Sequence, residues 1–274
     1  MQGHLVDIGG YRLHLYCIGE GLPTVIFDSG AFDSLQQWSR VQPQVGSITR
    51  ACSFDRAGLG WSDSSFQVPS FRHNAEDLRK LLLAARVPGP YILVGHSNGG
   101  LDVQDFAHSH TGSIVGMVLD DSVYADETLR FPERFKISGW LPLILRITMP
   151  IGIPRLFGWC DQTAACPDCR KFTNTVLNQL KSYSHSEQEV RSTHNFGDLP
   201  LVVLEHDPAV GLAGERDEAF EHAWVRWQKN LAALSSDSRL QIVDGVGHEI
   251  QKDRPEVVIE AVRWVIGQSR TNHP

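Results

Sequence analysis

The stretch Tyr91–Gly100, YILVGHSNGG, decides the fold of this chain. An apolar run of strand type leads directly into a Gly-x-Ser-x-Gly pattern centred on Ser97, and the residues that follow can continue as a helix. A serine at such a strand–turn–helix junction sits on a turn so tight that the residues two positions away must be small. Gly95 and Gly99 meet this requirement. The pattern therefore predicts a nucleophile elbow at Ser97 rather than an ordinary helix-capping serine.

Size and composition limit the classes of protein to which the chain can belong. Its 274 residues, 42% of them hydrophobic, can bury one large core. A net charge of −7 without a cluster of lysine or arginine argues against a nucleic-acid partner. The longest apolar stretch, residues 137–153, contains two prolines and an arginine and is too short to span a bilayer, so we expect no stable membrane insertion. No signal peptide is visible, which favours a cytoplasmic protein, although secretion of a trimmed form would fit the same sequence.

The five cysteines fall into two groups. Cys17 and Cys52 lie in predicted strands and are expected to be small buried residues. Cys160, Cys166 and Cys169 cluster, and the last two form a C-x-x-C pattern without the further ligands that a zinc site needs. We therefore expect no metal site in this cluster, and either free thiols or one local disulfide.

Apolar runs of strand length alternate with helical patterns along most of the chain. Eight strands are expected, at residues 4–7, 11–18, 24–27, 49–54, 91–94, 114–119, 201–204 and 240–243. Amphipathic or capped helical segments lie between and after them, at about 70–86, 101–108 and 220–234 and from residue 253 onward. This alternation is typical of a mostly parallel eight-stranded sheet with helices on both faces. The predicted fold class is therefore α/β.

The alternation stops in residues 124–197, which are rich in Pro, Trp, Phe and Leu. We interpret this segment as a helical lid inserted between the sixth and seventh strands. Within it, Ser186 and Glu189 have the spacing of a capping box and predict the start of a late helix. The predicted core domain accordingly consists of residues 1–123 and 198–274.

A substrate pocket is expected beneath this lid. The lid contributes aromatic side chains, among them Phe131 and Trp140, and the loop after the third strand contributes Gly30 and Phe32. These residues favour a pocket for an apolar group, although most of the lid's aromatic residues are expected to form its own small core.

A serine hydroxyl becomes a nucleophile only with an adjacent base and a group that orients that base. In parallel sheets such groups gather beyond the carboxyl ends of the strands. Of the twelve histidines, His248 fits best, because it follows the last strand across a flexible glycine-containing loop. Asp120, Asp121 and Asp207 all stand at strand ends and are the candidate acids.

Four stretches carry a resemblance to the α/β-hydrolase fold superfamily, and in particular to its serine esterases and lactonases. They are residues 27–30 (FDSG), 54–62 (FDRAGLGWS), 95–100 (GHSNGG) and 246–248 (VGH). Together they are specific for the superfamily and uninformative about the substrate. The order Ser, Asp, His along the chain is also the order that this fold uses.

The resemblance implies roles for further residues. Members usually carry the acid in a Gly-x-x-Asp turn after the strand equivalent to residues 201–204, and Asp207 follows that strand too closely for such a turn. Some relatives place the acid one strand earlier, where Asp121 stands, so Asp121 is preferred. By the same match, the backbone N–H groups of Asn98 and Ala31 would form the oxyanion hole.

These residues predict a serine hydrolase that cleaves a carboxylic ester or lactone with an apolar moiety through an acyl-enzyme, without metal or organic cofactor. Two alternatives stay open: a small-molecule receptor of the same fold with slow or single turnover, and a C–C bond hydrolase that uses the same triad. Dehalogenases and epoxide hydrolases of the superfamily need an aspartate where Ser97 stands, which argues against both.

Overall fold

The computed structural model describes residues 2–126, 168–190, 195–212 and 217–272, together with residues 130, 131, 140, 144, 147 and 148. Its centre is an eight-stranded sheet in the order β1-β2-β4-β3-β5-β6-β7-β8. Strand β2 runs antiparallel to β1 and β4, and every other neighbouring pair is parallel. The predicted α/β class and the mostly parallel eight-stranded sheet are confirmed.

The strands agree closely with the apolar runs of the sequence. Their bounds are β1 His4–Asp7, β2 Arg12–Ile18, β3 Thr24–Asp28, β4 Ala51–Phe54, β5 Tyr91–His96, β6 Ile114–Asp120, β7 Leu201–His206 and β8 Ser238–Val243. The central strands β3, β4, β6 and β7 are buried along their whole length, and β5 is buried after its first residue, Tyr91. Continuous apolar runs are the pattern that parallel strands covered on both faces require.

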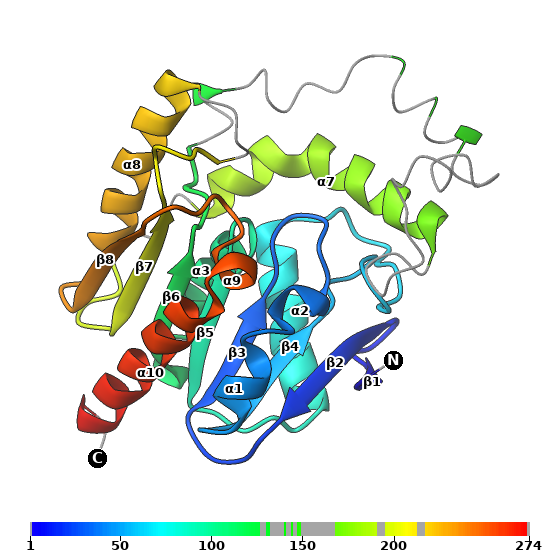
Figure 1. Cartoon of the computed structure of the whole chain (residues 1–274). Helices are drawn as coiled ribbons and strands as arrows, with labels where there is room; N and C mark the ends of the chain where they lie inside the picture. The colour runs from blue at the N-terminus through cyan, green and yellow to red at the C-terminus, as the bar shows by residue number, and fades with distance from the viewer. Residues whose placement is uncertain are drawn as a thin grey trace.

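Helices cover both faces of the sheet (Figure 1). The short α1, Gln42–Gly46, and the last helix α10, Pro255–Asn272, pack on one face. On the other face lie α2 Phe71–Ala84, α3 Gly99–Ser109 and α8 Glu218–Ala232. The short helices are η1 Leu35–Trp38, η2 Thr111–Ser113 and α9 Ile250–Asp253. Ser70 caps α2 by accepting a hydrogen bond from the backbone N–H of His73, as its position before an apolar-periodic segment predicts.

The structure corrects the prediction for two cysteines. The antiparallel pairing of β2 with β4 places Cys17 directly opposite Cys52, and the two form a disulfide. The expectation of two separate buried thiols was wrong, because it considered each strand alone and not the register between them. Cys160 and Cys166 lie outside the described residues, so the expectations for that cluster stay predictions.

The predicted lid, residues 124–197, lies largely outside the described residues. Its main described part is helix α7, Cys169–Val190, which packs against α2 and α3 (Figure 1). Ser186 lies inside α7, so the capping box predicted there is wrong: the helix begins much earlier. Among the helices that the structure describes, none has both the length and the hydropathy of a membrane span.

Candidate active site

Ser97 lies on the turn between β5 and α3. Its φ of 51° is in the left-handed region, which side chains other than glycine rarely adopt. A Cβ atom on Gly95 would lie 2.6 Å from the carbonyl oxygen of Gly99, and one on Gly99 would lie 2.6 Å from that of Asp28. The two glycines therefore permit the close approach of strand, turn and helix that a nucleophile elbow needs.

His248 follows β8 and contacts the carboxylate of Asp121. Its Nδ1 lies 2.6 Å from Asp121 Oδ2, and Asp121 is fully buried at the end of β6. The ring of His248 also packs 4.5 Å from that of His96, the residue before Ser97, so His248 lies beside the elbow. Because Nδ1 is occupied by the carboxylate, Nε2 is the ring nitrogen left to accept a proton from Ser97.

The other two candidate acids are placed differently. Asp207 holds its own turn together, because its carboxylate accepts hydrogen bonds from the backbone N–H groups of Ala209, at 2.8 Å, and Gly245, at 2.9 Å. Asp120 is fully buried, its carboxylate has no hydrogen-bond partner among the described residues, and burial raises its pKa well above the ordinary value. A carboxyl group that prefers to be neutral is unsuited to stabilise an imidazolium.

A second histidine and a tryptophan also hold Asp121. The Nδ1 of His206, at the end of β7, lies 3.0 and 2.9 Å from the two carboxylate oxygens, and Trp224 Nε1 donates to Oδ1 at 3.0 Å. Burial alone would raise the pKa of Asp121, but the hydrogen bonds from His206 and His248 outweigh it and hold the pKa below the ordinary range. Asp121 is therefore ionised at neutral pH.

The sequence reading did not find His206. Its position in the sequence could have indicated a role. His206 ends the strand after which members of the superfamily usually carry the acid of the triad. Here that strand end carries a histidine that donates to an acid on the neighbouring strand. The Nε2 of the same ring lies 2.9 Å from Glu221 Oε2 on α8.

The sequence predicts an oxyanion hole made of two backbone N–H groups, those of Asn98 and Ala31. Neither N–H donates a hydrogen bond to another described residue. Asn98 precedes the first turn of α3, where the helix dipole favours negative charge. Two unused N–H groups beside a nucleophile are the arrangement that stabilises a tetrahedral oxyanion.

Two buried side chains hold the two peptides that flank Gly30, one side chain on each peptide. Arg56 Nη2 donates to the carbonyl oxygen of Gly30 at 2.5 Å, and Gly30 N–H donates to Gln37 Oε1 at 2.8 Å. Because this carbonyl and the Ala31 N–H belong to one planar peptide, a bond to one fixes the direction of the other. Arg56, for which the sequence predicted no role, therefore orients the N–H of Ala31, one of the two predicted oxyanion donors.

Two buried acidic side chains, Asp28 and Asp102, contact the guanidinium of Arg56. Its Nη1 lies 2.6 Å from Asp28 Oδ1 and 3.2 Å from Asp102 Oδ2, and Asn74 donates to the same Asp102 carboxylate at 2.9 Å. Burial raises the pKa of Asp28 to about 6 and that of Asp102 well above its ordinary value, although Arg56 opposes both shifts. The loop that carries Ala31 is thus fixed by a buried ionic cluster.

His96 connects this loop to the base. Since Gln37 Oε1 accepts from Gly30, its NH₂ group faces His96 Nδ1 at 3.0 Å, and His96 Nε2–H donates to the backbone carbonyl of His248 at 2.9 Å. Burial lowers the pKa of His96 to about 3, so the ring is neutral, as these bonds require. The oxyanion loop and the His248 backbone are therefore joined through two buried side chains.

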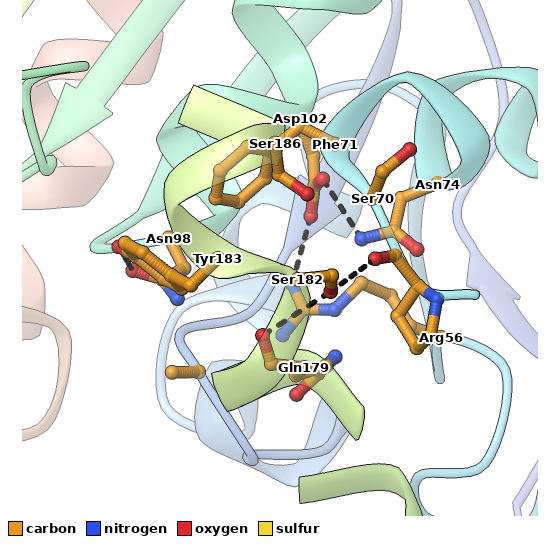
Figure 2. A pocket seen from close by; sticks show the side chains of 12 residues that line it. Arg56, Ser70, Phe71, Asn74, Asn98, Asp102, Gln179, Ser182, Tyr183 and Ser186 are labelled. Carbon is orange, nitrogen blue, oxygen red and sulfur yellow. Dashed lines mark hydrogen bonds and ion pairs between the residues drawn. The ribbon is translucent and has the colours of Figure 1, made fainter. Parts of the chain in front are cut away.

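A cavity of about 20 Å³ lies between the elbow and α7 (Figure 2). Tyr183 of α7 donates its hydroxyl hydrogen to Asn98 Oδ1 at 2.7 Å, and Figure 2 shows the two side chains together at one end of the cavity. Most of the residues around it carry a polar group, among them Ser70, Asn74, Asn98, Gln179, Ser182 and Ser186. The cavity has room for about one water-sized group.

The residues predicted to line an apolar pocket do not line this cavity. Gly30 lies beside the nucleophile, since a Cβ on it would be 3.4 Å from that of Ser97, and Phe32 follows the oxyanion loop with a φ of 62°. Phe131 packs on Phe220 of α8, with ring centroids 5.1 Å apart, and Trp140 is 73% exposed. The part of the lid between these two aromatic residues lies outside the described residues.

The described residues hold no group of three or more His, Cys, Asp or Glu side chains arranged to bind a metal ion.

Comparison with known proteins assigns the family. The model of the alpha/beta hydrolase family matches residues 25–261, so the chain belongs to this family. An uncharacterized protein of Schizosaccharomyces pombe aligns with 91% of the chain at 26% sequence identity. The protein YqjL of Bacillus subtilis aligns with 87% of the chain, also at 26% identity. The chain spans 47% of the length of the first relative and 81% of the second.

Solved structures agree on the fold. Est816, whose structure is described as that of an N-acyl homoserine lactone degrading enzyme, superimposes with a TM-score of 0.67 at 16% identity, covering 95% of this chain and 99% of that one. Structural neighbours of this chain include esterases, lactonases and an epoxide hydrolase. At such low identity they share the fold, which is used for several chemistries.

Proposed function

We propose that this protein is a serine hydrolase that cleaves a carboxylic ester or a lactone through a Ser97–His248–Asp121 triad. One observation carries the proposal: the strained elbow serine lies beside a histidine whose Nδ1 is held 2.6 Å from a buried, ionised aspartate. That is the arrangement of a nucleophile, a base and an orienting acid.

The reaction proceeds in two steps. His248 Nε2 takes the hydroxyl proton while Ser97 Oγ attacks the substrate carbonyl, and the N–H groups of Asn98 and Ala31 stabilise the oxyanion. His248 then gives the proton to the leaving alcohol, which departs and leaves an acyl group on Ser97. In the second step His248 removes a proton from water while the water oxygen attacks the acyl carbonyl. The bond from that carbonyl carbon to Ser97 Oγ then breaks, His248 returns the proton to Oγ, and the acid is released.

The nucleophile separates this proposal from other reactions of the fold. An epoxide hydrolase or dehalogenase of this family forms its ester on an elbow aspartate, whereas a serine forms an acyl-enzyme from a carbonyl substrate. The same triad would also serve a C–C bond hydrolase or a receptor that reacts once and retains its ligand. These two alternatives differ from an esterase in substrate and in turnover, not in the residues of the site.

The substrate itself is less defined than the reaction. The sequence favours an apolar acyl group, whereas the cavity that the described residues outline beside Asn98 is too small to hold an acyl chain. We propose an apolar acyl group from the aromatic side chains that the lid sequence carries.

The test is hydrolysis of 4-nitrophenyl esters of increasing acyl length, and of a series of lactones, by the wild type and by Ser97→Ala. We expect repeated turnover by the wild type and loss of at least about 10⁴-fold in kcat for the variant, because the nucleophile is removed. The control is the melting temperature, which should stay close to that of the wild type.

Three results distinguish the alternatives. Turnover that persists in Ser97→Ala would disprove the assignment of the nucleophile. One equivalent of product followed by a stable adduct on Ser97 would identify a receptor. Inertness toward every ester and lactone, together with cleavage of a 1,3-diketone, would identify a C–C bond hydrolase.

A further inference from the structure

We propose that His206 is a positively charged positioning residue, which bridges Asp121 and Glu221 and thereby sets the pH range in which His248 acts as a base. The inference rests on the proposed function, because His248 needs to be a base only if Ser97 is the nucleophile. His206 ends β7 and is fully buried.

The geometry requires a proton on each nitrogen of the His206 ring. Nδ1 lies within 3.0 Å of both oxygens of Asp121, and Nε2 lies 2.9 Å from Glu221 Oε2. An ionised carboxylate only accepts hydrogen bonds, so both ring nitrogens must donate, and an imidazole with two N–H groups is a cation. Burial opposes this charge, but the two carboxylates outweigh it and raise the pKa of His206 to about 9.

The bridge leaves the Asp121 carboxylate little freedom to rotate. Its Oδ1 accepts from the backbone N–H of His206, at 3.1 Å, and from Trp224, while its Oδ2 faces His248. The far end of the bridge is held as well, since Glu221 Oε1 accepts from the backbone N–H of Leu212 at 3.1 Å. The result is one row of ionisable side chains, Glu221–His206–Asp121–His248, whose first three members are buried and whose last lies beside the elbow of Ser97.

The two outer members of this row act on His248 in opposite directions. A positive charge near a histidine opposes its protonation and a negative charge favours it. His206 therefore weakens the hold of Asp121 on the proton of His248, and Glu221 partly cancels that effect. Removing one charge at a time separates this electrostatic role from a simple packing role. An electrostatic role shifts the pH dependence in opposite directions when His206 or Glu221 is neutralised, whereas a packing role would change it in the same direction in both variants.

Other ionisable groups also face this row. Glu205 and Asp207 flank His206 on β7 and the following turn, and Asp120 precedes Asp121 on β6. Further groups are Lys229 on α8 and, beside His248, His96 and Glu249. All of these groups are unchanged in the variants described below, so their electrostatic effect on His248 is the same in each variant.

The experiment measures the second-order rate of Ser97 phosphonylation by a fluorophosphonate probe between pH 5 and pH 10. The proteins are the wild type, His206→Gln, Glu221→Gln and the control His222→Gln, which removes an exposed histidine from the same helix. We expect the pH of half-maximal rate to rise by about 0.5–1 unit in His206→Gln and to fall by a similar amount in Glu221→Gln. His222→Gln should not move it.

Equal shifts in the same direction, or no shift in either folded variant, would overturn the proposal. If a single variant does not fold, the double variant His206→Gln/Glu221→Gln keeps hydrogen-bonding groups at both positions without the charges. In this double variant the pH of half-maximal rate should rise by less than the rise expected for His206→Gln. A pH profile identical to that of the wild type would contradict the proposal.

A second readout separates failure of this inference from failure of the proposed function. Absence of labelling in the wild type would reject Ser97 as nucleophile, whereas the charge on His206 can still be read from ¹⁵N NMR of histidine-labelled protein. Imidazolium shifts for His206 that persist at pH 8 support the bridge. Neutral-imidazole shifts at pH 7 would reject it.

Discussion

Asp121 shows how one carboxylate can be confined by its neighbours. It is fully buried, adopts a φ of 42° and accepts hydrogen bonds from three side chains. Ser97 and Phe32, beside the oxyanion loop, also have left-handed backbones. Such strain costs on the order of 1–3 kcal/mol per residue and persists only where the surroundings enforce it. Its concentration in one small region supports the assignment of that region as the active site.

The acid can be identified by a matched pair of variants. Asp121→Asn should lower kcat by about 10³- to 10⁴-fold, because an amide no longer selects the required tautomer of His248. Asp207→Asn is the control, since among the described residues the carboxylate of Asp207 accepts hydrogen bonds from backbone N–H groups alone, and kcat should stay within about twofold of the wild type. Steady-state kinetics on the best ester of the series checks both. A large loss in Asp207→Asn with little loss in Asp121→Asn would reverse the assignment.

The sequence was sufficient to propose the site residues that local chain geometry marks. Ser97 is marked by its flanking glycines, and His248 by its loop after the last strand. His206 and Arg56 act through partners 85 and 26 residues away in the chain, Asp121 and Gly30 respectively, so no local pattern marks them. Their roles depend on which strands are neighbours and on side-chain direction, and neither can be obtained from periodicity.

At the scale of elements, strand order explains both the successes and the failures of prediction. Apolar runs located the eight strands, because burial on both faces leaves a continuous signal. The Cys17–Cys52 disulfide was missed because it depends on the register of β2 against β4, two strands that are not consecutive in the chain. The start of helix α7 was predicted incorrectly. Serine is a common capping residue, but Ser186 is buried in the interior of the helix.

This disulfide should stabilise the fold without affecting the chemistry. It closes a loop of 35 residues, so the double variant Cys17→Ala/Cys52→Ala should unfold with a free energy lower by about 2–4 kcal/mol. Denaturant titration of the variant and of the wild type with and without a reducing agent provides the measurement. The reduced wild type should be destabilised like the variant, and the variant should not respond to the reductant. Equal midpoints for all samples would show that the crosslink contributes nothing.

At the scale of the whole molecule, the buried charges around the sheet make stability depend on pH. Burial raises the pKa of Glu205 to about 7, and its carboxylate is 1% exposed without a hydrogen-bond partner among the described residues. A carboxyl whose pKa is raised by folding contributes stability below its unfolded pKa, and that contribution is lost as the pH rises through the folded value. His206 adds a loss of the same sign between its ordinary pKa of 6.5 and about 9.

Glu205→Gln tests this dependence, because the amide has nearly the same shape and no charge. The variant should be more stable than the wild type above pH 7 and equally stable near pH 4, where both side chains are neutral. Chemical denaturation at pH 4, 6 and 8 checks the expectation, with the exposed Glu218→Gln on α8 as the control. A stability difference that does not vary with pH would contradict it.

The position of the triad along the chain has a consequence for biosynthesis. Ser97 and Asp121 come from one β5–α3–β6 unit, whereas His248 arrives only after β8 has joined the sheet beside β7. A nascent chain that has emerged only as far as residue 243 therefore contains the proposed nucleophile and its acid but no base. If the proposed triad is correct, Ser97 is not activated while the chain is still being synthesised. Hydrolysis then begins only when the carboxyl-terminal segment, which carries His248, has packed against the sheet.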